Sequence, residues 1–332
     1  MEKCPYFGRC GGCSLQHLED EAYTLYKENL VKEALSHKAL PVIPESLIRI
    51  PAPTRRRATF AFSNGHFGFN EKQSHKIVDI DSCAVLLPEL SAFIPTLAKF
   101  MKTFNSQGDV FVLMTDWGAD IKIDEQKKKY PSLETLERIA EFCNENNVAR
   151  LVLNGEPMYQ ATKLPFPSGA FMQPSKEGEE TLIRLVLDSV GDAKKVADLF
   201  CGLGTFTKPL AKAGKKVKGY DSAGESVETL AYSGIYGESR DLFRNPLEAE
   251  ELNAFDAVVL DPARAGAKEQ CEKITESDLK KVVMVSCHLG TFCRDARILV
   301  NAGFEIEKLT PVDQFVFSPH LEVVALFSKK NE

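Results

Sequence analysis

The stretch that decides the fold lies in the second half of the chain, where residues 196–206 read Val-Ala-Asp-Leu-Phe-Cys-Gly-Leu-Gly-Thr-Phe. The apolar run predicts a buried strand, and the Gly-x-Gly turn predicts a tight connection into a helix. In an open α/β sheet, ligands bind at the carboxyl ends of strands, where glycines let the backbone approach them closely. We therefore expect a nucleotide-like cofactor beside Gly202 and Gly204, although a tight turn without a ligand would have the same sequence.

The sequence on both sides of this stretch alternates between strands and helices. A helix is predicted over 176–190, and strands are predicted over 196–200, 217–221, 257–261, 282–286, 304–309 and 323–327. This alternation predicts an α/β fold with a Rossmann-like, mostly parallel, doubly wound sheet. The change of pattern comes at Pro165 and Pro167, so we assign this domain to residues 161–332.

The first half of the chain, residues 1–160, has a pattern typical of a mixed α+β domain. The apolar runs after residue 57, broken by Asn64-Gly65, predict a hairpin. The remaining predicted elements are helices over 19–38, 88–105 and 132–147 and strands over 77–80, 110–114 and 149–154.

Length, composition and charge exclude several classes of protein. The 332 residues suffice for two domains, and no run approaches the roughly 18 apolar residues of a membrane helix. The N-terminus does not read as a signal peptide, so we expect a cytoplasmic protein whose nine cysteines stay reduced. The net charge of −6 offers nucleic acid no general attraction, so an RNA-binding surface must be local. The candidates are Arg55-Arg56-Arg57 and Lys127-Lys128-Lys129.

Acidic residues follow further strands of the predicted sheet. The strand after the Gly-x-Gly turn ends at Asp221, whose carboxylate can accept hydrogen bonds from ribose hydroxyls. Thr207 replaces the third glycine of the dinucleotide-binding pattern, and the start at Asp198 resembles the first motif of S-adenosylmethionine-dependent methyltransferases. Asp241 follows a short predicted strand, and we expect it either to face an adenine or to cap the next turn at the surface.

Two more strand ends carry the candidate catalytic residues, in the sequences Asp261-Pro262-Ala263-Arg264 and Ser286-Cys287-His288. A proline after a strand ends the hydrogen-bond ladder and exposes the carboxylate before it. Buried free cysteines are common, so Cys287 taken alone would more often be structural. Its position at a strand end in the ligand crevice favours a nucleophile.

The order and spacing of these motifs resemble the RNA uracil-C5 methyltransferases, particularly the bacterial enzymes that modify 23S ribosomal RNA. The resemblance covers nearly the whole chain. It rests on Phe171-Met172-Gln173, residues 198–206 and 261–266, Ser286-Cys287 with Thr291 and Arg294-Asp295, and His320-Leu321-Glu322. Two positions depart from the family pattern: His288-Leu289 replaces the usual Asn-Pro, and Ser175 replaces an asparagine.

The resemblance implies covalent catalysis on uridine. Uracil C5 is too weak a nucleophile to take a methyl group unless a thiolate first adds to C6, and a base must then remove the C5 proton. Cys287 matches the family's nucleophile and Glu322 matches its base, although a glutamate can also simply open an edge strand. By the same resemblance, S-adenosylmethionine would be held by Gln173, Phe200 and Asp221, while Asp261 would contact the uracil or the cofactor.

The N-terminal segment supplies thiols at the spacing Cys4-x5-Cys10-Gly-Gly-Cys13, and Cys83 follows the predicted hairpin and strand. Three closely spaced thiolates can hold three corners of a metal cluster while the fourth comes from elsewhere in the chain. The resemblance implies a [4Fe-4S] cluster on these four cysteines. The thiolate ligands by themselves suit tetrahedral zinc equally well.

The resemblance implies an RNA partner, with 23S ribosomal RNA favoured over tRNA. A rival from a different class is a non-catalytic RNA-binding or assembly factor that retains the fold. We expect no N-terminal RNA-binding β-barrel ahead of Cys4, so the arginines at 55–57 and the cysteine region would grip the RNA. We also expect the segment 14–46 to pack on the catalytic domain, and a monomer without membrane contact.

Overall fold

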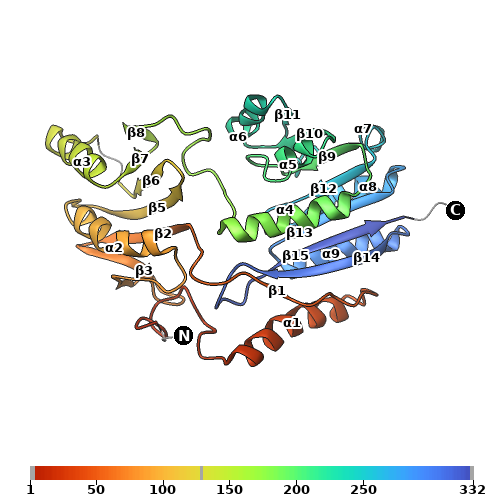
Figure 1. The fold of residues 1–332 in the computed structure, drawn as a ribbon, viewed down its shortest axis with the longest axis horizontal. Helices are drawn as coiled ribbons and strands as arrows, with labels where there is room; N and C mark the ends of the chain where they lie inside the picture. Colours follow the sequence, from red (N-terminus) through yellow and green to blue (C-terminus); the bar gives the residue numbers. More distant parts are fainter. Residues whose placement is uncertain (1–3, 128–129, 330–332) are drawn as a thin grey trace.

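Two β-sheets lie side by side in the computed structural model, which describes residues 4–127 and 130–329 (Figure 1). Lys128 and Lys129 of the second basic run lie outside the described residues. The C-terminal sheet consists, in spatial order, of β1 (Ile48–Arg49), β14 (Glu305–Asp313), β15 (Glu322–Ser328), β13 (Lys281–Ser286), β12 (Ala257–Leu260), β9 (Lys195–Leu199), β10 (Lys216–Asp221) and β11 (Tyr236–Ser239).

Most neighbouring strands of the C-terminal sheet are parallel. β9 pairs in parallel with β10 and β12, and parallel pairs also join β12 to β13, β10 to β11 and β1 to β14. β15 runs antiparallel to both of its neighbours, β13 and β14. The predicted α/β fold with a mostly parallel, doubly wound sheet is therefore confirmed.

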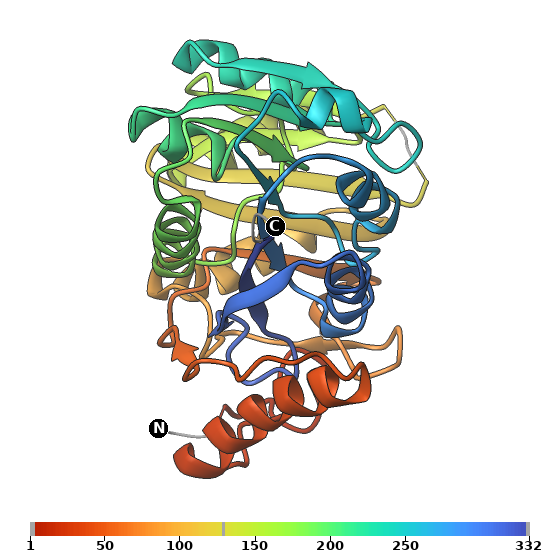
Figure 2. The same ribbon diagram turned by 90° about the vertical axis from the view of Figure 1, so that its right-hand side faces the viewer.

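Helices cover both faces of this sheet. Every residue of β12 is buried, as expected for a parallel strand covered on both sides. One face packs against α4 (Lys176–Val190) and α5 (Thr207–Lys212), and the other against α1 (Asp20–His37), α8 (Lys268–Glu276) and α9 (Leu289–Asn301). Figure 2 shows α4 and the pair α8 and α9 on opposite sides of the strands. The remaining connections contain the short helices α6 (Gly224–Glu228), η1 (Thr229–Ser233) and α7 (Ala249–Leu252).

The N-terminal sheet consists, in spatial order, of β4 (Ile77–Asp79), β3 (His66–Asn70), β2 (Arg57–Ser63), β5 (Gln107–Thr115), β6 (Gly118–Glu125), β7 (Val148–Leu153) and β8 (Glu156–Gln160). Its neighbours are antiparallel except for β6 and β7. One face packs on α2 (Pro88–Met101) and α3 (Leu133–Glu145) in a single apolar cluster. The structure adds β6 and β8 to the predicted strands. In β8, Pro157 and polar neighbours are tolerated because the strand lies at the sheet edge.

The N-terminal segment connects the two sheets. Val31 and Leu35 of α1, followed by Leu40, belong to the apolar core of the C-terminal sheet, and β1 extends that sheet beside β14. In Figure 1, α1 (red) runs beneath the strands β14 and β15 (blue). None of the helices in the described ranges combines the length and apolar character needed to cross a bilayer.

Candidate active site

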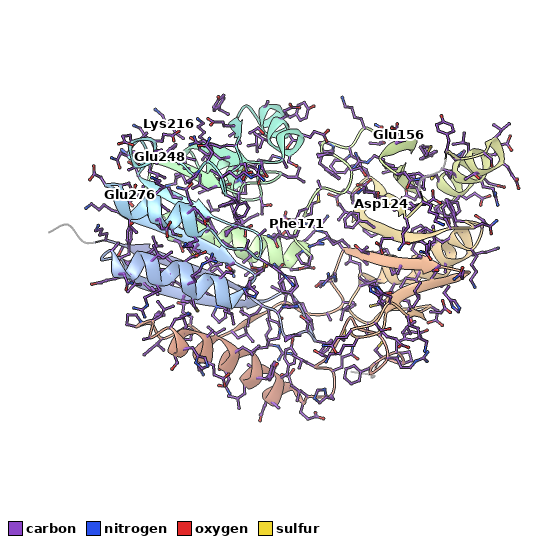
Figure 3. All side chains as sticks on the ribbon, turned by 180° about the vertical axis from the view of Figure 1, so that it is seen from behind. Asp124, Glu156, Phe171, Lys216, Glu248 and Glu276 are labelled. Carbon is purple, nitrogen blue, oxygen red and sulfur yellow. The ribbon has the colours of Figure 1, made fainter. Side chains whose placement is uncertain are left out.

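A cavity of about 830 Å³ opens at the carboxyl ends of β9, β10, β12 and β13. The predicted site residues that line it are Gln173, Phe200, Gly202, Asp221, Asp261, Cys287 and Glu322. Parallel strands bring their carboxyl ends to one edge of the sheet, which is why residues far apart in sequence converge here. Phe171 also lines the cavity and lies between the two sheets (Figure 3).

The turn after β9 forms one part of the cavity, called the cofactor end because the predicted cofactor residues Phe200, Gly202 and Asp221 lie there. The Asp221 carboxylate accepts hydrogen bonds from the backbone N–H groups of Gly202 (2.9 Å) and Ala223 (2.8 Å). Each carboxylate oxygen keeps acceptor capacity after one such bond, so Asp221 can still bind hydroxyl groups. The Phe200 ring packs against Phe243, with the ring centroids 5.2 Å apart. Phe243 also lines the cavity, and no sequence pattern marks this single loop aromatic.

Gly204 and Asp241 are not among the residues that line this cavity. Gly204 has a left-handed conformation (φ 84°), and a Cβ there would overlap the Leu230 side chain. Asp241 accepts a hydrogen bond from the Phe243 N–H at 3.1 Å and lies 3.6 Å from Arg244 Nε. These contacts are those of a turn-capping aspartate, the second of the two expectations for this residue.

A second part of the cavity, called the catalytic end because it holds the predicted nucleophile and base, brings a thiol close to two carboxyl groups. Asp261 follows β12, Cys287 follows β13, and Glu322 opens β15. Burial raises the pKa of Glu322 to about 7, although a hydrogen bond from Gln314 acts in the opposite direction. Burial, followed by the charge of Glu322, raises the pKa of Asp261 well above its usual value. Glu322 can therefore both take up and release a proton near neutral pH.

The Cys287 thiol is protonated at neutral pH in the free protein. Burial, followed by the charges of Glu322 and Asp261, raises the pKa of Cys287 to about 11, while Arg264 opposes this rise. A thiolate is the reactive form of cysteine, so the thiol proton must leave before Cys287 can act as a nucleophile. Arg264 and His320 both line the cavity, and Arg264 Nη2 lies 3.4 Å from His320 Nε2.

Gln314 is a buried polar residue that no motif in the sequence marks. Its side-chain Nε2 donates to Gln173 Oε1 at 2.9 Å and to Glu322 Oε1 at 3.2 Å. One amide therefore contacts both a predicted cofactor residue and the predicted base.

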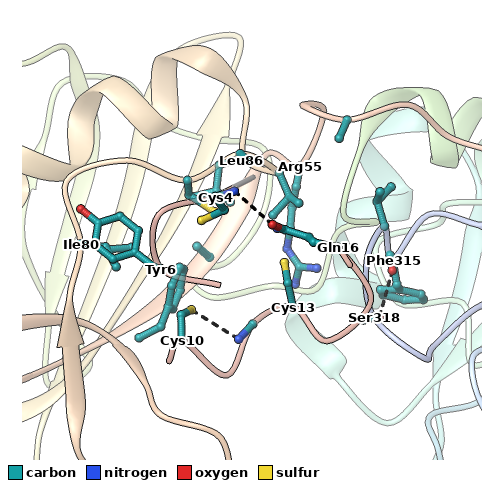
Figure 4. Close-up of a pocket in the computed structure, with 18 of the residues that line it drawn as sticks. Cys4, Tyr6, Cys10, Cys13, Gln16, Arg55, Ile80, Leu86, Phe315 and Ser318 are labelled. Carbon is teal, nitrogen blue, oxygen red and sulfur yellow. Dashed lines mark hydrogen bonds between the residues drawn. The ribbon is translucent and has the colours of Figure 1, made fainter. Parts of the chain in front are cut away.

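A second cavity, of about 290 Å³, is lined by Cys4, Cys10, Cys13 and Cys83 (Figure 4). All four are half-buried free thiols, and burial is the largest cause that raises the pKa of Cys13 to about 11. Across the described part of the chain, no group of three or more His, Cys, Asp or Glu side chains is placed to hold a metal ion. The four predicted ligands thus share one cavity, and a metal centre on them stays a prediction.

The arginine run does not present three side chains to solvent. Arg56 is buried, where its Nε donates to the Gln173 carbonyl at 2.9 Å and its Nη2 pairs with Glu179. The expectation that all three arginines grip RNA is therefore corrected for Arg56, since its donors are engaged inside the protein. Arg55 and Arg57 line both cavities. The Arg57 guanidinium lies 4.6 Å from the centre of the Phe171 ring.

Known proteins resemble this chain over nearly its whole length. Residues 232–330 match the family model described as tRNA (Uracil-5-)-methyltransferase. An uncharacterized RNA methyltransferase of Rhizobium meliloti is 39% identical over 97% of this chain and 83% of its own length. The 23S rRNA (uracil(1939)-C(5))-methyltransferase RlmD of Vibrio parahaemolyticus is 31% identical over 98% of this chain and 81% of its own length.

A solved structure has the same fold. It is the Pyrococcus abyssi tRNA (uracil-54, C5)-methyltransferase in complex with S-adenosyl-L-homocysteine, with a TM-score of 0.76 and 23% sequence identity. The similarity covers 96% of this chain and 86% of that protein.

Proposed function

This chain belongs to the RNA (uracil-5-)-methyltransferase family, and on that premise we propose that it methylates C5 of a uridine in 23S ribosomal RNA, with S-adenosylmethionine as the methyl donor. The observation that carries the proposal is the single cavity lined by the thiol of Cys287, the carboxyl groups of Glu322 and Asp261, and the turn after β9. The relative named for 23S rRNA favours that substrate, and the tRNA enzyme with the same fold makes tRNA the second candidate.

The cofactor end fits the methyl donor. When bound, S-adenosylmethionine supplies an electrophilic methyl group on a sulfonium. The Asp221 carboxylate would accept hydrogen bonds from the ribose hydroxyls, because two backbone N–H groups already fix its orientation. Phe200 and Phe243 would flank the adenine, and Gln173 would bind the polar end of the donor.

The catalytic end fits covalent catalysis. The Cys287 thiol loses its proton to solvent water in the open cavity, and the thiolate forms a bond to uracil C6, which moves an electron pair to C5 and its neighbouring carbonyl. C5 would then form a bond to the methyl carbon while the methyl–sulfur bond of the donor breaks, and the sulfur would keep that electron pair and leave as S-adenosyl-L-homocysteine. Glu322 takes the C5 proton, and the electron pair of the broken C–H bond restores the C5–C6 double bond and expels the thiolate. A carboxylate with a pKa near 7 suits this last step at neutral pH.

We propose that the two domains have different functions: residues 1–160 bind the RNA, and residues 161–332 methylate it. Arg55 and Arg57 support this division because they place positive charge on the wall of the catalytic cavity. The target uridine must leave its base stack to reach Cys287. An RNA substrate also supports a cytoplasmic enzyme, which we propose acts as a monomer.

Methyl transfer tests the function directly. The purified protein is incubated with labelled S-adenosylmethionine and unmodified 23S ribosomal RNA or tRNA, and the nucleosides are then separated. We expect label in 5-methyluridine from 23S ribosomal RNA. Transfer to tRNA alone would favour the second candidate, and label in no uridine of either RNA would overturn the proposal.

Variants of the proposed nucleophile and base test the mechanism. Cys287→Ala should abolish both methyl transfer and any covalent protein–RNA complex. Glu322→Gln should accumulate that complex, because the C5 proton is no longer removed. Cys293→Ala, a change to a buried cysteine of α9 outside the cavity, is the matched control and should transfer methyl groups normally.

We also propose that Cys4, Cys10, Cys13 and Cys83 hold a [4Fe-4S] cluster rather than zinc. The preference for iron rests on the resemblance to the iron-sulfur-containing members of the family, since four thiolates by themselves suit tetrahedral zinc equally well. The four thiols line one cavity, and a [4Fe-4S] cluster would use one thiolate at each corner. Metal and sulfide analysis with an absorbance spectrum after anaerobic purification should show iron. Stoichiometric zinc would contradict the proposal, and Cys143→Ser serves as the control for Cys13→Ser.

A further inference from the structure

We propose that Gln314 is a positioning residue that couples the binding of the methyl donor to the orientation of the base Glu322, an inference that rests on the proposed function. Gln314 directly follows β14 and is 4% exposed. The N–H groups of its single amide reach Gln173 Oε1 at 2.9 Å and Glu322 Oε1 at 3.2 Å. Both partners line the catalytic cavity.

The surrounding structure holds this amide in one orientation. A reversed amide would place its oxygen against the Glu322 carboxylate, where two acceptors repel each other. The Gln314 oxygen instead lies against Gly178 in the first turn of α4, and a Cβ at that position would overlap it. The preceding residue, Asp313, is fixed by a hydrogen bond from Tyr23 and an ion pair with Lys27.

The contacts of Gln314 link the binding of the methyl donor to the removal of the C5 proton. The Gln314 amide nitrogen has two N–H groups, which match the two acceptors that it contacts. When S-adenosylmethionine binds Gln173 and holds its amide in one orientation, it therefore also holds the Gln314 amide. The Gln314 amide in turn holds the Glu322 carboxylate. Glu322 Oε2 is buried without a partner among the described residues, so it is the oxygen left to take the C5 proton.

The contact with Gln314 affects the pKa of Glu322, which lies among other ionisable groups. Glu322 faces the ionisable groups of Asp261 and Cys287, and the same cavity is lined by the charged or titratable side chains of Arg55, Arg57, Asp221, Arg264 and His320. The hydrogen bond from Gln314 lowers the pKa of Glu322 against the effect of burial. Loss of this bond should therefore raise that pKa and delay formation of the carboxylate as pH increases.

Two variants test the coupling from opposite sides. Gln314→Met keeps the side-chain length but removes the donor. Gly178→Ala leaves both acceptors intact and displaces the Gln314 amide, although its Cβ would also press on the Ser175 hydroxyl that caps α4, so its melting temperature is measured beside its rate. For each, the rate of a single turnover is measured against pH, and the affinity for S-adenosylmethionine is measured by calorimetry. We expect the acidic limb of the rate profile to move up by about one pH unit. Binding of S-adenosylmethionine should weaken by about threefold to tenfold.

Gln270→Met is the matched control, because Gln270 is an equally buried glutamine whose amide bonds to the backbone of Leu247 on the outer side of the sheet. It should lower stability and leave both the pH limb and the affinity unchanged. An unmoved limb in Gln314→Met or in Gly178→Ala, with normal methylation by the wild type, overturns this inference alone. Failure of the wild type to methylate any uridine overturns the proposed function and this inference together.

Discussion

At the scale of single residues, Glu322 and Asp198 carry carboxyl groups that the fold has removed from water. Burial raises the pKa of each to about 7. One oxygen of each group, Asp198 Oδ1 and Glu322 Oε2, is buried without a hydrogen-bond partner in the described structure. A buried carboxyl group binds its proton more tightly than it does in the unfolded chain, so ionisation at these positions opposes folding.

This linkage predicts how Glu322 affects stability. Its pKa is near 4.5 in the unfolded chain and about 7 in the folded protein, so its contribution to the free energy of unfolding falls as pH rises through that interval. Glu322→Gln cannot ionise and should be more stable than the wild type by about 1 to 3 kcal/mol at pH 8, with little gain at pH 4.5. Urea denaturation at both pH values measures the difference. Glu141→Gln, at an exposed position of α3, is the control. An equal gain in the free energy of unfolding of Glu322→Gln at both pH values would refute the prediction.

At the scale of secondary-structure elements, both departures from the family pattern fall at helix N-caps. Ser175 caps α4 by accepting a hydrogen bond from the Gly178 N–H, and His288 caps α9 by accepting one from the Thr291 N–H. Asparagine, which the family pattern has at both positions, is also a good N-cap residue. The substituted residues therefore preserve the local capping role.

The cap at α9 can be tested beside the nucleophile. His288→Ala removes the acceptor for the Thr291 N–H and should lower the free energy of unfolding by about 1 kcal/mol, whereas His288→Asn should restore most of it. Methylation rates should follow the same order, because the first turn of α9 positions Cys287. Equal melting temperatures for the two variants would show that the cap contributes nothing.

A buried ion pair fixes α1 to the end of β14. Lys27 and Asp313 are both almost inaccessible to water, and their charged atoms lie 2.8 Å apart. Lys27→Met would leave the aspartate buried without its cation and should cost about 3 to 5 kcal/mol. The double variant Lys27→Met/Asp313→Asn should recover part of this loss in urea denaturation. Lys32→Met, at a half-exposed position of the same helix, is the control and should change stability by less than about 0.5 kcal/mol.

At the scale of the whole molecule, the two cavities share a wall. Gly12, Arg55, Arg57, Phe315 and Ser318 line both of them. The cysteine loop contacts both sheets: the Gly11 N–H donates to the Asn70 carbonyl, and the Ser14 and Leu15 N–H groups donate to the Phe317 carbonyl. The N-terminal segment thus connects the N-terminal sheet to the loop between β14 and β15 that precedes Glu322.

Arg57 at this wall and its buried neighbour Arg56 should have separate roles. Arg57→Gln should weaken RNA binding. The slope of the logarithm of the binding constant against the logarithm of the salt concentration should become shallower by about one, as expected for the loss of one phosphate contact. Arg56→Gln should leave the slope unchanged and lower stability by about 1 to 3 kcal/mol, since it breaks the bonds to Gln173 and Glu179. Filter binding across a salt series and thermal melts separate the two effects. A smaller slope for Arg56→Gln would contradict this assignment.

The sequence by itself determined the α/β class, most of the strands, and the acidic and sulfur-bearing residues at their ends. These features are local, because apolar runs, glycine turns and a residue that ends a parallel strand can be identified from neighbouring positions. It also predicted the four cysteines that line one cavity.

The tertiary structure alone decided which polar residues face one another. Gln314 contacts Gln173 across 141 positions, and Arg56 pairs with Glu179 rather than facing solvent. Asp241 likewise caps a turn, although its place after a strand also suited an adenine contact. Such pairings depend on the approach of distant segments. A lone glutamine or arginine has no local pattern that distinguishes a buried partner from an exposed side chain.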